Sequence, residues 1–87
     1  MTEETLLEFP CQFSLKAFGR DEGNFETLIF DIVTQFVKQL PRSAASSRPS
    51  SKGSYLAVTV DFTATSKAQL DQIYQALTDD KRVVMAL

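Results

Sequence analysis

The chain has 87 residues, which suffice for one domain and are too few for two. A hydrophobic content of 44%, with seven Phe, supplies a core for that size. The net charge of −2 argues against a general affinity for nucleic acids or anionic membranes. One Cys and no His exclude an intramolecular disulfide and argue against a zinc site, so we expect no metal and no cofactor.

The first nine residues are predicted to be a short acidic lead-in to a single domain over residues 10–87. They begin Met-Thr-Glu-Glu-Thr-Leu-Leu-Glu and lack the long apolar run of a secretory signal. No later apolar run has the length that a bilayer span requires. We therefore expect a cytoplasmic protein that does not enter the membrane.

The first regular element is a strand from about Cys11 to Phe18. Apolar and polar residues alternate along it, which is typical of a strand with one buried face. The apolar positions are Cys11, Phe13, Leu15 and Ala17. Because no His is available to activate the thiol, we interpret Cys11 as a small core residue and not as a nucleophile.

A helix from about Asn24 to Leu40 follows a turn over Gly19–Gly23. Apolar residues recur at three- and four-residue intervals, which places them on one stripe of a helix. The stripe consists of Phe25, Leu28, Ile29, Ile32, Val33, Phe36, Val37 and Leu40. The side chain of Asp21 or Asn24 is expected to cap this helix, and Pro41 prevents its continuation.

The second half of the chain predicts two more strands, a helix and a weak edge strand. Residues 42–54 are polar and favour at most a short strand between Ser43 and Arg48. Tyr55–Thr63 alternates as a clear strand. A capping box at Ser66–Gln69 starts a helix that runs to about Leu77. A last strand over Arg82–Leu87 is expected to place Val83, Met85 and Leu87 on one face.

The order strand-helix-strand-strand-helix-strand predicts an α+β fold. Two amphipathic helices and strands with one apolar face bury these surfaces best as a two-layer sandwich. The fold class is therefore a ferredoxin-like βαββαβ sandwich, with a four-stranded antiparallel sheet and both helices on one face. The polar second strand belongs at an edge of that sheet.

Residues 49–55, Pro-Ser-Ser-Lys-Gly-Ser-Tyr, resemble the corresponding loop of the small bacterial YbeD-like proteins, which are also called lipoate-regulatory-like. Phe9-Pro10, Lys16–Gly19 and Ile73–Leu77 extend the resemblance over most of the chain. Members of that family look like ferredoxin-like domains similar to the ACT regulatory domains of metabolic enzymes. The resemblance implies a regulatory or binding role without naming a ligand.

The same loop is the candidate binding site. Lys52 supplies a cation, the two serines supply hydroxyls, and Gly53 allows close approach of a ligand to the backbone. No acid occurs between Leu40 and Asp61, so Arg42, Arg48 and Lys52 form a basic stretch suited to a carboxylate or phosphate. The candidate residues are Arg48, Ser50, Ser51, Lys52, Gly53 and Tyr55. An ordinary β-turn accounts for the same residues, and this alternative stays open.

We expect a non-enzymatic, ACT-like module that senses a small anionic metabolite, binds a protein partner, or does both, as a homodimer. No catalytic or metal-binding residues are predicted. An RNA-binding ferredoxin-like domain is the alternative, although only Phe18 and Tyr55 are placed to stack on bases. A small acyl-phosphate hydrolase is a weaker alternative, because Asn24 is the only Asn and acids occupy the first loop.

Overall fold

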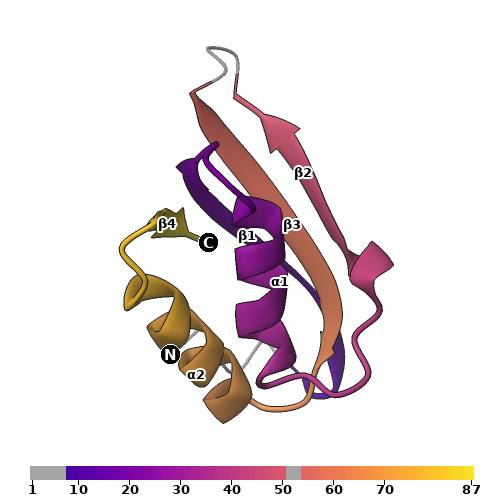
Figure 1. The fold of residues 1–87 in the computed structure, drawn as a ribbon. Helices are drawn as coiled ribbons and strands as arrows, with labels where there is room; N and C mark the ends of the chain where they lie inside the picture. Colours follow the sequence, from indigo (N-terminus) through magenta and orange to yellow (C-terminus); the bar gives the residue numbers. More distant parts are fainter. Residues whose placement is uncertain (1–7, 51–53) are drawn as a thin grey trace.

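The computed structural model describes residues 8–50 and 54–87. The elements are β1 (Cys11–Arg20), α1 (Phe25–Thr34), the short 3-10 helix η2 (Arg42–Ala44), β2 (Ala45–Pro49), β3 (Tyr55–Ala64), α2 (Lys67–Thr78) and β4 (Val83–Ala86). The strands form one antiparallel sheet in the order β2-β3-β1-β4. Both helices lie on the same face of this sheet (Figure 1). The prediction of a ferredoxin-like α+β sandwich is thereby confirmed.

The core lies between the two central strands and the two helices. β1 and β3 pair over ten residues, with Leu15 opposite Val60 and Ala17 opposite Val58. Cross-strand partners share a face of the sheet, so these alternating apolar residues all point toward the helices. The buried residues are Leu15, Ala17, Phe25, Ile29, Ile32, Val33, Ala45, Val58, Val60, Phe62, Ala64, Leu70, Ile73 and Leu77.

α1 ends at Thr34, so the prediction that it continues to Leu40 was wrong. The backbone N–H of Gln35 donates to Ile32 O at 3.2 Å, and Gln39 has a left-handed φ of 59°. The tighter 3-10-type turn at Gln35 ends the regular helix, and the left-handed Gln39 lies five residues beyond Thr34. Phe36, Val37 and Leu40 still pack against the core, which explains why the apolar rhythm outlasts the helix.

The two helix starts differ in their caps. Asn24 is the N-cap of α1, but its side chain makes no capping hydrogen bond, so a side-chain cap was wrongly predicted there. For α2 the predicted Ser66 cap is confirmed, since the backbone N–H of Gln69 donates to Ser66 Oγ at 3.0 Å. The Gln69 side chain also accepts from the N–H of Thr65 at 2.8 Å and donates to Phe36 O at 2.9 Å. Gln69 thus joins α2 to the segment that follows α1.

β4 does not present its residues as predicted. The pairing of β1 with β4 shifts register between Phe18 and Gly19, so Phe18 faces Met85 whereas Gly19 faces Val83. Val83 and Ala86 pack against the core. Met85 and Leu87 are 52% and 61% exposed, so the prediction that they share a face with Val83 was wrong. An extra residue at a bulge reverses the alternation of the side chains that follow it.

Gly19 lies at this register shift, where β1, α1 and β4 meet. A methyl group at its α-carbon would lie 2.6 Å from Phe25 Cε1 and would also meet the carbonyl oxygen of Arg82. Glycine therefore allows the buried ring of Phe25 and the start of β4 to approach the strand closely.

Candidate functional site

The sheet has one face without helices, which we call the open face. β1 contributes every second residue from Gln12 to Arg20, and β3 contributes every second residue from Tyr55 to Thr63, because cross-strand partners point the same way. Ser46 and Arg48 of β2 join this face, since they pair with Thr59 and Ala57. Met85 of β4 joins it opposite Phe18.

A hollow of about 440 Å³ lies on the open face over β1, β3 and β2. Its lining residues are Lys16, Phe18, Ser46, Ser47, Arg48, Ala57 and Thr59. All of them except Ser47 stand in two rows across the sheet, and the central member of each row is the small Thr59 or Ala57. The longer side chains on the two outer strands therefore rise around a shallow centre.

The hollow carries two positive charges that lack a carboxylate partner among the described residues. The ion pairs within 4.0 Å in that part of the chain are Arg42–Glu26, Lys67–Asp71 and Arg82–Asp80. Asp61, the acid of β3 on this face, accepts a hydrogen bond from the Ser14 hydroxyl. Lys16 and Arg48, with the hydroxyls of Ser46 and Thr59, thus favour an anion in the hollow.

The structure describes only some of the predicted site residues in the 49–55 loop. Ser51, Lys52 and Gly53 lie outside the described residues. The backbone N–H of Ser50 donates to Tyr55 O at 2.8 Å, and the Tyr55 N–H donates to Ser50 Oγ at 3.3 Å. These bonds tie the end of β2 to the start of β3. The role of Ser50, Ser51, Lys52 and Gly53 in binding stays a prediction.

Tyr55 and Arg48 both lie on the open face. Tyr55 is 41% exposed, and the guanidinium carbon of Arg20 lies 5.8 Å from the centre of its ring. This distance permits a cation–π contact. Arg48, which pairs with Ala57, is the predicted site residue that lines the hollow.

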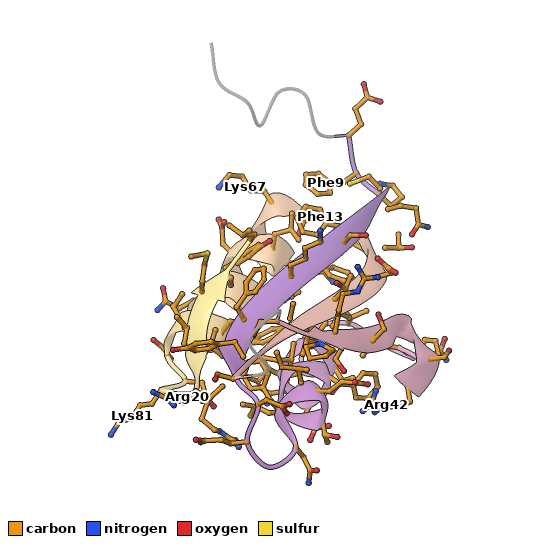
Figure 2. The ribbon with its side chains drawn as sticks, turned by 90° about the horizontal axis from the view of Figure 1, so that it is seen from above. Phe9, Phe13, Arg20, Arg42, Lys67 and Lys81 are labelled. Atoms are coloured by element: carbon orange, nitrogen blue, oxygen red, sulfur yellow. The ribbon has the colours of Figure 1, made fainter. Side chains whose placement is uncertain are left out.

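Arg42 does not join Arg48 in a single basic patch. Its Nη1 atom lies 2.8 Å from Glu26 Oε2, and its guanidinium carbon lies 5.2 Å from the centre of the Phe30 ring. Figure 2 shows Arg42 at the side of the molecule away from Arg20. Hydrogen bonds from the Ser47 hydroxyl and from Arg42 lower the pKa of Glu26 below 4.5. Arg42 therefore joins η2 to α1, and Glu26 neutralises its charge.

Comparison with known proteins identifies the family. Residues 4–87 match the family described as "Protein of unknown function (DUF493)". The chain belongs to the DUF493 family. A UPF0250 protein of Paraburkholderia phytofirmans is 43% identical over 84 residues, which are 97% of this chain and 94% of that protein. A UPF0250 protein of Nitrosomonas europaea is 39% identical over 87 residues, the whole of both chains.

This membership confirms the resemblance to the YbeD-like proteins, and a solved structure supports the fold. The solution structure of protein HP0495 from H. pylori superposes with a TM-score of 0.67. The superposition covers 93% of this chain and 85% of that one, at 14% identity. At such low identity the likeness concerns the fold alone.

Sequence reasoning missed six members of the hollow in this DUF493 protein, namely Lys16, Phe18, Ser46, Ser47, Ala57 and Thr59. The alternation of apolar and polar residues in β1 and β3 is enough to put Lys16 and Thr59 on the face opposite the core, which is the open face. The sequence did not predict the strand register, which pairs Lys16 of β1 and Ser46 of β2 with the same residue of β3, Thr59. Register depends on long-range pairing, which a period-two pattern leaves undetermined.

A second hollow, of about 580 Å³, lies between the segment after α1 and the end of β3. The charged residues in its lining are Lys38 and Asp61, which have opposite signs. It therefore does not favour a ligand of either charge, in contrast to the hollow on the open face.

Neither a cluster of metal-ligating side chains nor a membrane-spanning helix occurs in the described part of the DUF493 chain. It contains no group of three or more His, Cys, Asp or Glu that could hold a metal ion. Within the same residues, no helix is long and apolar enough to cross a membrane. Cys11 is half-buried and packs against the core.

Proposed function

We propose that this DUF493 protein is a non-enzymatic binding module, similar to an ACT regulatory domain, that binds a small anionic metabolite on its open face. One observation carries the proposal. Lys16 and Arg48 line the same hollow from the two sides of β3, and neither has a carboxylate within 4.0 Å among the described residues.

The chemistry of the lining favours recognition over catalysis. A guanidinium group binds a carboxylate or phosphate through two parallel hydrogen bonds, and an ammonium group adds a flexible point charge. The hydroxyls of Ser46 and Thr59 supply further donors, and the ring of Phe18 supplies an apolar wall. The lining contains no carboxylate, imidazole or thiol to move a proton.

A regulatory role follows if the bound anion changes how the protein associates with a partner. The hollow extends to side chains of β2 at the edge of the sheet, which a homodimer or another protein can contact without pairing with the strand. A bound anion neutralises Lys16 and Arg48 and alters the charge that such a partner meets.

The experiment is a thermal melt of the purified protein against amino acids, lipoate, octanoate, nucleotides and acyl phosphates. A ligand at about 100 times its Kd adds roughly 2.7 kcal/mol of stability. For a domain of this size, that raises Tm by about 10 °C or more. We expect at least one carboxylate or phosphate compound to produce such a shift.

Three variants test the place of binding. Arg48→Ala and Lys16→Ala change exposed residues, so both should keep the wild-type Tm without ligand and lose most of the ligand-induced shift. Lys38→Ala removes an exposed lysine outside the hollow and should keep the full shift. A flat panel, equal shifts in all three variants, or turnover of an acyl phosphate would each contradict the proposal.

A further inference from the structure

β4 leaves apolar surface exposed at one edge of the sheet. Val84, Met85 and Leu87 are 64%, 52% and 61% exposed, and they account for three of the four exposed large hydrophobic residues of the described chain. The opposite edge strand, β2, consists of Ala45, Ser46, Ser47, Arg48 and Pro49. Polar residues and proline protect an edge strand from pairing with other chains, and β4 lacks that protection.

The backbone of β4 is also available at this edge. Leu87 and Lys16 exchange both of their backbone hydrogen bonds, at 3.0 and 2.7 Å. Bonded and non-bonded positions alternate along an antiparallel ladder, so the N–H and C=O of Ala86 point away from β1. β4 is the last strand of the sheet, and among the described residues it pairs with β1 alone.

Positive charges flank both ends of β4. A hollow of about 180 Å³ at its start is lined by Arg20, Glu22, Lys81, Arg82 and Val84. Figure 2 shows Arg20 and Lys81 together at this corner of the molecule. Arg82 is paired with Asp80 at 3.8 Å, whereas Arg20 and Lys81 have no carboxylate within 4.0 Å in the described chain.

Lys16 supplies a positive charge at the other end of β4, opposite Leu87. The edge thus combines an apolar stripe, free backbone groups and cations at both ends. These features match an extended segment with apolar residues in its centre and acidic residues at its two ends.

We propose that the β4 edge binds an extended acidic segment of a partner protein, which adds to the sheet as a fifth strand. Its backbone pairs with Ala86, its apolar side chains cover Val84 and Met85, and its carboxylates reach the cations at the two ends. A second copy fits less well. Antiparallel pairing of two β4 strands sets the Arg20–Lys81 corner of one against the Lys16 end of the other, which brings like charges together.

The test uses a nine-residue fluorescein-labelled peptide with two Glu at each end and alternating Val and Thr in its centre, with a peptide that carries Lys in place of each Glu for comparison. We expect the acidic peptide to bind, with an affinity that falls as salt is added. In ¹⁵N NMR the amide of Ala86 should exchange more slowly with solvent when the peptide is bound. This readout is independent of the anion hollow, because Ala86 lies outside its lining.

Matched variants locate the binding. Val84→Glu places a negative charge on the exposed β4 stripe and should weaken the acidic peptide at least tenfold. Gln72→Glu adds the same charge on the exposed surface of α2 and should change the affinity less than twofold. Equal effects of the two substitutions would overturn the proposal, as would equal binding of the Lys peptide, absence of acidic-peptide binding, or an unchanged Ala86 amide. A dimer abolished by Val84→Glu, without acidic-peptide binding, would assign this edge to a second copy.

Discussion

Gly19→Ala should destabilise the fold strongly, because the new methyl group has no room at the junction of β1, α1 and β4. It would meet the ring of Phe25, which is 1% exposed, and the backbone carbonyl of Arg82. A carbonyl in the chain that leads into β4 cannot rotate away as a flexible side chain can. Either the start of β4 or the buried ring must therefore shift.

The expected loss of unfolding free energy is about 3 kcal/mol, the upper part of the usual range for an overpacked core. A domain of 87 residues has a total stability on the order of 4–13 kcal/mol. At about 4–8 °C per kcal/mol, Tm should fall by roughly 12–24 °C. Gly23→Ala is the matched control, since nothing lies within 4 Å of its added methyl and the loss comes only from the φ of 58°. That conformation destabilises an Ala by about 1 kcal/mol.

Urea unfolding and thermal melts of both variants measure the difference. The reasoning is refuted if Gly19→Ala lies within 0.5 kcal/mol of the Gly23→Ala value. A double variant tests the cause directly. Phe25→Leu removes the ring atom that lies 2.6 Å from the new methyl. The double variant should therefore lose less unfolding free energy than the sum of the losses of Gly19→Ala and Phe25→Leu measured singly.

Two further substitutions test contacts that join the elements. Gln69→Ala removes the hydrogen bonds to Thr65 N and Phe36 O, so it should lower the free energy of unfolding, measured in urea, by about 2 kcal/mol. The control Gln72→Ala changes an exposed residue and should stay within about 0.5 kcal/mol of wild type. Equal losses in the two variants would contradict the bridging role of Gln69. Glu26→Gln should lower stability near pH 7. The folded state lowers the pKa of Glu26 from 4.5, so the extra stability of the wild type should be present above pH 4.5 and disappear as pH falls through the lower folded pKa. A stability difference between wild type and Glu26→Gln that stays constant from pH 7 to pH 3 would show that the charge of Glu26 is not its cause.

The sequence predicted the order and packing of the elements because its signals there are local. Alternation in β1 and β3 and the capping box of α2 each depend on residues close together in the chain. The end of α1 was mispredicted for a physical reason. Phe36 and Val37 are apolar because they contact the core, and helical spacing and core contact produce the same pattern over those residues.

The candidate site could be predicted only in part, because it depends on contacts between distant residues. Arg48 was identified from the scarcity of acids near the 49–55 loop. Lys16 is 32 positions away in the sequence and joins it only through the register of three strands. Arg42 was grouped with Arg48 for its charge, but Glu26 of α1 neutralises it. The exposure of Met85 follows from a bulge for which the sequence carries no local signal.

Lys16 belongs to both proposed surfaces, and this overlap gives a test that neither surface gives alone. Its side chain lines the anion hollow, and its backbone pairs with Leu87 at the end of β4. Lys16→Ala should therefore weaken both the anion and the acidic peptide. Arg48→Ala should weaken the anion alone, because two strands separate β2 from β4, and Val84→Glu should weaken the peptide alone. If Lys16→Ala leaves peptide binding unchanged, its charge does not act at β4, and the basic corner formed by Arg20 and Lys81 must account for any preference for acids.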